Sequence, residues 1–530
     1  MLKTQIGVAF ILLCLAGPAG AQAFGSLVGT VRDQSGGVVS GVAVTAASQQ
    51  TGIAYSQVSS SDGDYAFSHL PIGTYTVTFS APSFRKLRVQ EIKVHVSTVL
   101  RQDATLGLAS FRARVKVVSS TPLVETDTAE IGQLVDARQI TELPLNGRDI
   151  FSLLTLAAGA ETGVSPGARF TTTERPTLAG GRAGYTVFRV DGVDINSQNL
   201  PSASVVPGVD AVQEFRAITQ LAPASESSTS SVNVVLRSGT NEFHGAAYDF
   251  FRNNVLDAHP FFERNIVAPG FQPMPDQLRY NQFGGALGGP IQKDQTFFFL
   301  NLQLTRSKTL SQVSTLEPTA GMVAGDFSGV NPLSGAALGN FAPVIDPATL
   351  QPLPGNRIPS ASVSAFAQKF ISAGGFLTAN CPACQAEDLG FNYVGEAAGH
   401  LSNSQFLGRV DRRISDRDSI FGDFQVEPAV QTHDASPNPI SATQIPTRAY
   451  FGALNETHAF SPNALNEIRL GYTRLRATLE QQQSANGAFT FQNTPTSLPS
   501  LYPTLDFVGY PQRFGNGEIS DRNFSLEDSW

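Results

Sequence analysis

The sequence predicts an exported, mainly β protein whose second half consists of strands from a membrane β-barrel. Three observations indicate this: a turn-rich and charge-poor composition, an N-terminal apolar segment, and strand-like alternation interrupted by unequal loops. Of the 530 residues, 48 are Gly, 32 are Pro and 36 are Phe. Charged residues make up only 15% of the chain, against the roughly 25% of an ordinary soluble domain. The length is sufficient for about three or four domains.

The charge balance and the reactive side chains exclude several classes of protein. The 36 basic and 44 acidic residues give a net charge of −8, so we expect no nucleic-acid binding, which requires a basic surface. Three cysteines exclude a disulfide framework and a multi-cysteine zinc fold. No His begins an H-x-x-E or H-E-x-x-H pair, and we find no paired carboxylates or catalytic triad. We therefore expect no enzyme, no metal site and no cofactor.

The chain begins with a segment typical of a secretory signal peptide. A lysine precedes an apolar run over residues 6–16, and an A-x-A site follows at residues 19–21. We expect cleavage after Ala21, with Ala23 as the second option, so residues 1–21 form the signal peptide. The alternative is a membrane anchor, but the run is shorter than the ~20 residues that span a bilayer. The exported chain can then enter a membrane only as a β-barrel.

Residues 24–108 predict a small β-sandwich. Short strand-like runs alternate with turn signals there, as in an all-β domain. The patterns G-V-x-V, S-D-G-D-Y-x-F and L-P-x-G-x-Y-x-V, at residues 41–44, 61–67 and 70–77, resemble the carboxypeptidase regulatory-like domain. The resemblance implies a sandwich that contributes no catalysis.

Residues 112–240 carry three signatures in order. The first, L-P-L-N-G-R-D over 143–149, places an Asn-Gly turn before a run that is spaced for a short helix. The second, over 185–194, predicts a strand, an Asp-Gly turn and a strand. The third runs over 231–245 and ends in S-G-T-N-E-F-H-G. Following a signal peptide and the sandwich, the three resemble the plug domain of a TonB-dependent outer-membrane receptor of the Oar-like type.

The turns of the first two signatures hold the plug positions that we expect to matter most. These positions are Asn146, Gly147, Arg148, Asp191, Gly192 and Asp194. For each of them, turn geometry or packing between plug and barrel explains the residue at least as well as ligand contact does.

The resemblance also implies a short extended segment in the periplasm, which the energy-transducing protein TonB grips by adding a strand. The candidate is the run directly before the plug: Arg114, Val115, Lys116, Val117, Val118 and Ser119. An acidic residue often precedes such a segment, but here Arg112 and Arg114 occupy that place. An additional strand of the sandwich or the plug is an equally good interpretation.

Residues 241–530 alternate as membrane β-strands do. In the run over 296–305, apolar side chains alternate with a face that carries Asn301, Gln303 and Thr305. We expect strands near 242–252, 280–291, 296–307, 403–414, 419–427, 448–460 and 464–475, with an eighth near 518–530. Short connections alternate with long ones such as 308–402, which is the pattern of periplasmic turns and outer loops.

The resemblance implies that these strands are the first of a 22-stranded transmembrane barrel. The expected fold is therefore mainly β: a signal peptide, a small β-sandwich, an α+β plug domain, and an incomplete barrel. A partial barrel leaves a bare edge in lipid, which is not viable. We therefore expect the sequence to be a fragment or a truncated reading frame.

Cys381 and Cys384 are the two cysteines expected to remain after export. They lie in a Gly-, Ala- and Pro-rich stretch of an expected outer loop, without the βαβ context of a thioredoxin-like redox pair. We expect a small structural disulfide in preference to redox chemistry or a metal site.

The leading functional hypothesis is a TonB-dependent receptor and transporter in the outer membrane of a Gram-negative-type bacterium. Outer loops and plug would bind a ligand, and TonB would pull on the plug to open a path. Expected partners are a TonB-type protein, outer-membrane lipid, and a ligand that the resemblance leaves open among glycans, siderophores and peptides. The direction of transport is also open. The alternative is a surface adhesion protein or carbohydrate-binding scaffold without transport.

Overall fold

The computed structural model describes most of the chain from residue 24 onward. The described residues are 24–108, 116–118, 130–163, 175–182, 185–198, 203–221, 228–258, 277–315, 317–329, 343–372, 376–381, 391–433, 443–461, 464–481 and 517–529. The expected signal peptide, residues 1–21, lies outside them, as do Arg114, Val115, Ser119 and Cys384. Among the described residues, no helix is both long enough and apolar enough to cross a membrane.

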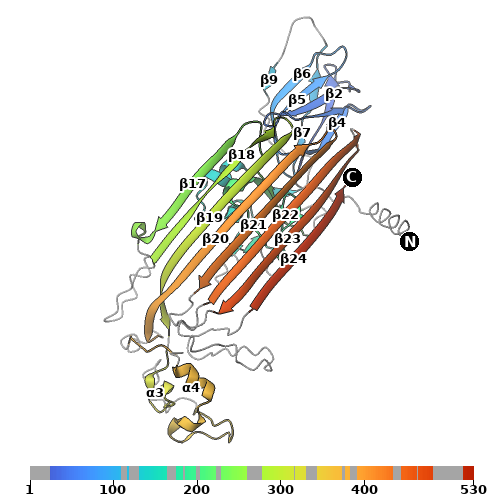
Figure 1. The fold of residues 1–530 in the computed structure, drawn as a ribbon. Helices are drawn as coiled ribbons and strands as arrows, with labels where there is room; N and C mark the ends of the chain where they lie inside the picture. Colours follow the sequence, from blue (N-terminus) through green and yellow to red (C-terminus); the bar gives the residue numbers. More distant parts are fainter. Residues whose placement is uncertain are drawn as a thin grey trace, which may run out of the picture.

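Residues 24–108 form a β-sandwich beside one end of a much larger sheet (Figure 1). One layer has the strand order β4-β1-β7, with β8 also paired to β1, and the other has the order β3-β2-β5-β6-β9. The strands are β1 (Gly25–Asp33), β2 (Ala43–Ser48), β3 (Ala54–Val58), β4 (Asp64–Leu70), β5 (Gly73–Ser80), β6 (Leu87–Val94), β7 (Val99–Arg101), β8 (Ala104–Leu106) and β9 (Lys116–Val118).

The sandwich has its own core because its strands alternate in polarity. Tyr75, Val77 and Phe79 of β5 point inward and are at most 1% exposed, whereas the residues between them are half-buried. Leu27 and Val31 of β1 meet them from the other layer and are fully buried. The apolar side chains of this core come from the sandwich itself.

A second unit, which we call the inner domain (residues 130–236), is built on a mixed sheet with the order β10-β15-β16-β13-β14. Its strands are β10 (Ile131–Val135), β11 (Ala160–Gly163), β12 (Arg175–Leu178), β13 (Val187–Val190), β14 (Val193–Asp194), β15 (Val212–Gln220) and β16 (Ser231–Leu236), with β11 and β12 paired separately. Helix α2 (Ala137–Glu142) begins at a capping box, in which Asp136 and Gln139 each accept the other's backbone N–H. The short helix expected after the Asn-Gly turn is a 3₁₀ helix, Ile150–Leu156.

In the described part of the chain, eight strands pair in sequence order to form one antiparallel sheet, which we call the large sheet. They are β17 (His244–Asn253), β18 (Gln277–Gln292), β19 (Thr296–Thr315), β20 (Tyr393–Arg413), β21 (Asp418–His433), β22 (Thr443–Ser461), β23 (Ala464–Gln481) and β24 (Gly517–Ser529). The mainly β fold class with an incomplete barrel is confirmed.

Two strands reach far into the expected loop 308–402. β19 continues to Thr315, and β20 begins at Tyr393, about ten residues before the expected start. The extension of β19 is largely polar and that of β20 is rich in Gly and Ala, so neither shows the regular apolar alternation by which a membrane strand is recognised. Between them, the described residues include the short helices α3 (Ala320–Val323) and α4 (Ala365–Ser372).

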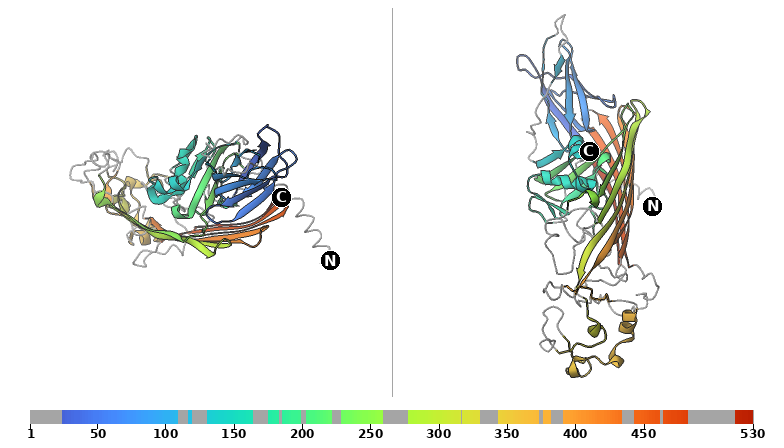
Figure 2. Two further views of the ribbon diagram at one scale, coloured as in Figure 1. Left: turned by 90° about the horizontal axis from the view of Figure 1, so that it is seen from above. Right: turned by 90° about the vertical axis from the view of Figure 1, so that its left-hand side faces the viewer.

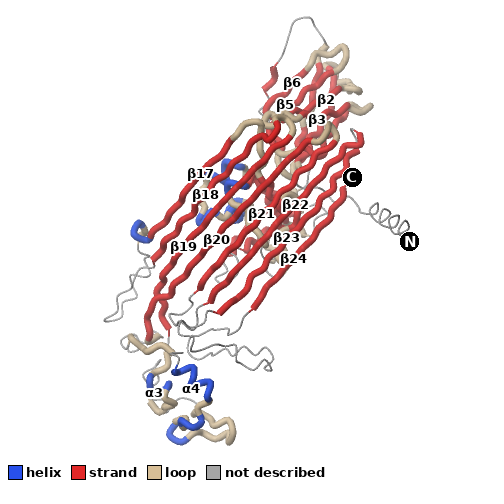
Figure 3. The backbone as a smooth tube through the Cα atoms, viewed as in Figure 1, coloured by secondary structure: helices blue, strands red, loops and turns tan. Residues whose placement is uncertain are grey.

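The large sheet is curved, and the inner domain lies against its concave side (Figure 2). We call this side the inward face and the opposite side the outward face. At one end, which we call the turn end, only a few residues connect β18 to β19, β20 to β21 and β22 to β23, and the sandwich lies there. At the opposite end, the loop end, lie α3 and α4 (Figure 3).

Candidate functional site

The Asp-Gly turn of the inner domain meets the inward face of the large sheet. The turn joins β13 to β14, in the strand-turn-strand arrangement that the sequence predicts. Asp191 and Gly192 have φ angles of 45° and 81°, in the left-handed region that Gly and Asp adopt more readily than other residues. Asp191 is 1% exposed, so its carboxylate must find its partners inside the protein.

Those partners lie on β20 and β21. Arg409 places Nη1 2.7 Å from Oδ2 of Asp191, and Nη2 2.8 Å from Oδ1 of Asp411. Asp423 lies 3.9 Å from the same guanidinium. One buried cation thus joins a carboxylate of the inner domain to two carboxylates of the sheet. Burial raises the pKa of Asp191, while the charge of Arg409 opposes this shift.

A second arginine packs on the same turn. A Cβ atom added to Gly192 would overlap the guanidinium of Arg469, so any other residue would displace that side chain. Arg469 itself pairs with Glu467, and its Nη1 lies 3.0 Å from Glu527 on β24. Gly192 therefore satisfies two requirements at once, the positive φ of the turn and the close approach of the sheet.

Asp194 has a role within the inner domain. Its Oδ1 accepts a hydrogen bond of 2.7 Å from the backbone N–H of Asn196. The residues that follow bind β24: Gln198 donates to Oδ1 of Asn523 at 2.7 Å, and Nδ2 of Asn523 donates to the carbonyl of Asn196 at 3.1 Å. Asp194 shapes the segment that makes these contacts.

A cavity of about 210 Å³ lies between the inner domain and the inward face, toward the loop end. Gly147 and Arg148 of the L-P-L-N-G-R-D signature line it. Arg148 pairs with Asp210 at 2.5 Å, and its guanidinium lies about 4.5 Å from the ring centroids of Tyr248 and Phe250 on β17. The backbone of Asn146 lies in the turn beside them.

Amide side chains line much of the rest of this cavity. Glu427 accepts hydrogen bonds from Asn403 at 2.8 Å and from Gln405 at 3.0 Å. Gln405 and Gln425 both donate to the carbonyl of Val206 in the inner domain, at 3.1 and 3.3 Å. The cavity therefore offers many hydrogen-bonding groups, with Arg148 paired to Asp210 and Glu427 hydrogen-bonded to neutral amides.

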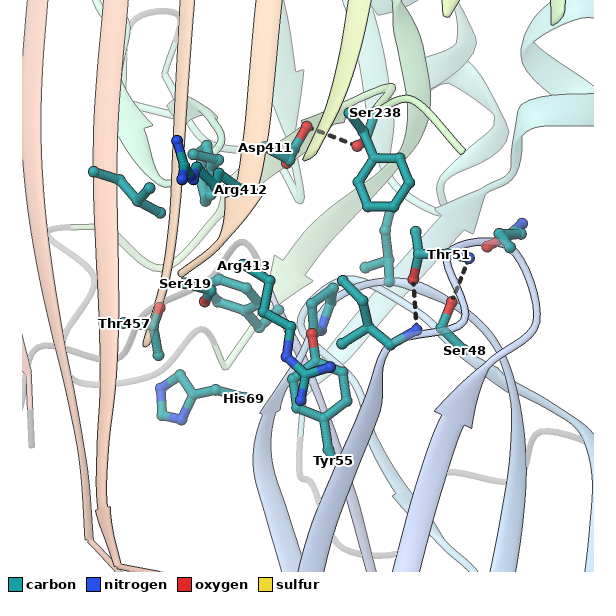
Figure 4. A pocket seen from close by; sticks show the side chains of 18 of the residues that line it. Ser48, Thr51, Tyr55, His69, Ser238, Asp411, Arg412, Arg413, Ser419 and Thr457 are labelled. Atoms are coloured by element: carbon teal, nitrogen blue, oxygen red, sulfur yellow. Dashed lines mark hydrogen bonds between the residues drawn. The ribbon is translucent and has the colours of Figure 1, made fainter. Parts of the chain in front are cut away.

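A second cavity, of about 240 Å³, separates the sandwich from the turn end of the large sheet. Figure 4 shows His69 and Tyr55 of the sandwich facing Arg413 of β20, while Asp411 of the same strand accepts a hydrogen bond from Ser238. Arg413 donates to the carbonyl of Ala54 at 3.4 Å. Burial raises the pKa of Tyr55 to about 12 and lowers the pKa of His69.

Direct contacts hold the sandwich to both of its neighbours. Glu214 of the inner domain lies 2.8 Å from Nδ1 of His95 and accepts the backbone N–H of Val96 at 2.6 Å. Asn241, just before β17, donates to the carbonyl of Thr51 at 2.8 Å. The sandwich is therefore attached through a few polar contacts around a cavity.

The middle of the candidate TonB segment forms a strand of the sandwich. Lys116, Val117 and Val118 make up β9, which pairs in parallel with Arg88, Val89 and Gln90 of β6 at the edge of the five-stranded layer. The segment thus adopts the extended conformation that strand addition requires, and its partner in this structure is the sandwich.

Two small clusters complete the set of candidate site residues. Cys381 is disulfide-bonded and 8% exposed, whereas its expected partner, Cys384, lies outside the described residues. At the turn end, Asp418, Glu456 and His458 could supply one metal ligand each. Asp418 and His458 already pair with each other at 2.5 Å, which accounts for their proximity without a metal.

The sequence analysis missed the sheet side of the site. It selected Asp191 and Gly192, but not Arg409 or Arg469, which contact them. Both arginines occupy positions on the polar face of strands whose other face is apolar. A charged residue in the middle of such a strand is a signal for a buried pair, because lipid cannot solvate it on the other side.

Comparison with known proteins places the larger part of the chain in one family. The family model described as "Outer membrane beta barrel domain" matches residues 235–530, which is more than half of the chain. A second model, "Carboxypeptidase regulatory-like domain", matches residues 26–107.

Individual proteins are also similar to this chain. The TonB-dependent transporter Oar of Myxococcus xanthus is 26% identical over 311 residues, which cover 56% of this chain and 28% of that protein. The chain thus spans less than a third of the length of this relative. Similar solved structures include the siderophore receptor PirA from Acinetobacter baumannii (TM-score 0.38, 13% identity, 66% of this chain and 40% of that one). The outer membrane transporter YddB from Escherichia coli is another (TM-score 0.43, 9% identity, 67% and 40%).

Proposed function

Because the chain belongs to the outer membrane beta barrel domain family, we propose that it is part of a TonB-dependent receptor and transporter. Its location is the outer membrane of a Gram-negative bacterium. The relative Oar is a transporter, and transport of this kind requires no catalytic group. The inner domain would act as the plug, and the large sheet as a part of the barrel wall.

The proposal rests on the two arginines of the large sheet that contact the Asp-Gly turn, which together we call the clamp. Arg409 pairs with Asp191, and Arg469 packs on Gly192, so two strands of the wall hold one turn of the enclosed domain. Withdrawing one partner of a buried ion pair leaves the other charge buried without compensation, which costs about 3–5 kcal/mol. The clamp therefore suits a plug that must stay closed at rest and be displaced only by applied energy.

The cavity toward the loop end is the proposed ligand site. Its lining of Gln, Asn and backbone carbonyl groups favours a neutral ligand with many hydrogen-bonding groups, such as a glycan or a peptide. The charge of Arg148 is taken up by Asp210 and two aromatic rings, so it is less available to an anionic iron chelate. The ligand would enter from the loop end, and the TonB-type protein would act on the chain from the turn end.

The proposed energy-coupling segment is 114–119, gripped by the periplasmic domain of a TonB-type protein through strand addition. The test uses the full chain in outer-membrane vesicles and measures binding of that periplasmic domain by fluorescence. Val117→Pro removes a backbone N–H, so we expect binding to weaken by about tenfold. Val117→Thr keeps both the N–H and the branched side chain, and we expect it to bind as the unaltered chain does.

The alternative of an adhesion protein or scaffold predicts a different result. Under that alternative the periplasmic domain would not bind the unaltered chain at all, and Val117→Pro would change only the stability of the sandwich. Equal binding by the Pro and Thr variants would show that TonB grips another segment.

A further inference from the structure

One strand of the clamp, β20, also holds the sandwich. Arg409 of β20 pairs with Asp191 of the inner domain. Arg413 lies four residues further along β20, next to the short turn that leads to β21, and donates to the carbonyl of Ala54 in the sandwich at 3.4 Å. At about 3.3 Å per residue, the two arginines are roughly 13 Å apart along the strand. On this strand the sandwich therefore lies on the turn-end side of the clamp.

The other strand of the clamp, β23, shows the same order. Arg469 packs on Gly192 of the Asp-Gly turn. Glu467 is two residues nearer the beginning of β23, which is at the turn end, and it pairs with Arg469. The other carboxylate oxygen of Glu467 lies 3.8 Å from Nε2 of His69 in the sandwich. Each strand that contacts the Asp-Gly turn thus contacts the sandwich next, in the direction of the turn end.

The cavity of about 240 Å³ lies between the clamp and the sandwich. Asp191, Arg409 and Asp411 line it on the side of the clamp, and Tyr55 and His69 line it on the side of the sandwich (Figure 4). An Asp-Gly turn that moved toward the turn end would enter this cavity and meet the sandwich.

Glu214 fixes the sandwich to the inner domain. It lies on β15, is 5% exposed, and accepts the backbone N–H of Val96 at 2.6 Å, while its Oε2 lies 2.8 Å from Nδ1 of His95. In the sheet of the inner domain, Glu214 is opposite Val235 near the end of β16, beside which β13 leads into the Asp-Gly turn. The contact with the sandwich and the clamped turn are therefore at the same end of that sheet.

The sandwich bridges the joint between the inner domain and the large sheet. Besides the contacts of Glu214 and Arg413, Asn241 just before β17 donates its side-chain N–H to the carbonyl of Thr51 at 2.8 Å and its backbone N–H to that of Gln50 at 3.1 Å. Among the described residues, the apolar clusters of the sandwich and of the inner domain share no member. Hydrogen bonds break at modest cost where water replaces them, so the sandwich can leave as a unit.

We propose that the sandwich is a removable cap over the clamp, positioned by Glu214, and that it must leave the large sheet before the Asp-Gly turn can leave Arg409. The inference rests on the proposed function, in which the inner domain is the plug and the TonB-type protein acts from the turn end. The clamp stabilises the docked inner domain, whereas the cap hinders its movement. Glu214 is then a positioning residue, which acts through the sandwich.

The test measures how often the Asp-Gly turn leaves the large sheet, with the full chain in outer-membrane vesicles. Val193, next to the turn, is 2% exposed and packs on Gly471 of β23, so the thiol of Val193→Cys reacts with iodoacetamide only after the turn has moved away. A disulfide formed by Thr51→Cys and Asn241→Cys traps the sandwich on the large sheet. With the trap closed, labelling of residue 193, read from the mass of its peptide, should slow about tenfold.

The second arm tests the role of Glu214. Glu214→Gln keeps the shape of the side chain but removes its charge, so labelling of residue 193 should become several-fold faster in the chain without the trap. With the trap closed, that acceleration should disappear, because the sandwich can no longer leave. The matched control is Glu142→Gln, at an exposed position of α2, which should leave the labelling rate unchanged.

A control for access of the reagent uses Ser419→Cys, whose side chain lines the cavity. It should react at the same rate with the trap open and closed, which shows that iodoacetamide passes the sandwich. Equal slowing at residue 419, equal labelling of residue 193 with and without the trap, or an effect of Glu214→Gln that persists in the trapped chain would overturn the cap.

These measurements require no TonB-type protein. A failure of its periplasmic domain to bind the chain would remove the proposed function, whereas the labelling of residue 193 would still show whether the sandwich hinders the Asp-Gly turn. The two failures are therefore distinguishable.

Discussion

The sandwich and the inner domain are both built on β-sheets, but they are stabilised in different ways. The core of the sandwich is closed by its own residues, such as Leu27 and Phe79. The core of the inner domain continues into the large sheet through Phe299, Leu407 and Phe451, and its Asp-Gly turn is clamped by arginines of that sheet. The sandwich is thus an independent unit attached by a few polar contacts, whereas the inner domain depends on the wall around it.

Removing the clamp, the contact of Arg409 with the Asp-Gly turn, should have the largest effect on the stability of the inner domain relative to that of the sandwich. Arg409→Ala leaves Asp191 and Asp423 buried without their cation, and we expect a loss of about 4 kcal/mol in the stability of the docked inner domain. Limited proteolysis in outer-membrane vesicles should then cut the inner domain while the sandwich stays intact. Arg412→Ala, on the outward face next to it, is the control and should leave the pattern unchanged. Protection of the inner domain in both variants would contradict the clamp.

The converse change tests the independence of the sandwich. Leu27→Ala removes a fully buried side chain from its core, and we expect a cost of about 3 kcal/mol. Thermal unfolding should show a lower transition for the sandwich, with no change in proteolysis of the inner domain. Val38→Ala, at a 48% exposed position, should change stability by less than about 0.5 kcal/mol. Simultaneous loosening of the inner domain would show that the two units are coupled.

A smaller effect separates turn strain from contact with the sheet. Gly192→Ala introduces a Cβ where φ is 81° and where it would overlap the guanidinium of Arg469, and we expect about 2 kcal/mol of destabilisation. Gly36→Ala has a similar φ of 89° but open space around it, so its cost should come from φ alone. If the two substitutions have equal effects, measured by thermal unfolding, the packing of Arg469 on the turn is unimportant.

The smallest effect expected is a pH dependence of the sandwich contact. Burial lowers the pKa of His69 below its usual value, against the attraction of Glu467, which lies 3.8 Å away, and with a further small decrease from Arg469. A depressed pKa means that the contact is fully stable above the unfolded pKa of about 6.5 and weakens as the pH falls through the lower, folded value.

Disulfide trapping between cysteines placed at Thr51 and Asn241 measures this contact. Trapping in the otherwise unaltered chain should decrease as the pH falls from 7 to 5, after correction for thiolate reactivity against a fixed reference pair. The His69→Gln variant should lose that dependence. A dependence that persists in His69→Gln would assign it to another group.

Sequence alone predicted the parts that local periodicity determines. The alternation of Leu300 and Leu302 with Asn301 and Gln303 is visible within ten residues, and β19 lies where that pattern predicts it. The clamp was beyond reach because it joins Asp191 to Arg409, which are 218 residues apart. The Asp-Gly motif pointed to Asp191 but nothing singled out Arg409, and only the packing of the inner domain on the large sheet brings the two together.

The parallel pairing of β9 with β6 has a mechanical consequence. β9 lies in the chain between the sandwich and the inner domain, and three residue pairs hold it to β6. Tension applied along β9 would load these pairs in shear together, whereas tension across the edge would peel them apart one after another. A pull directed through this segment therefore meets a threshold at the sandwich before it reaches the inner domain, and the direction of the pull sets the height of that threshold.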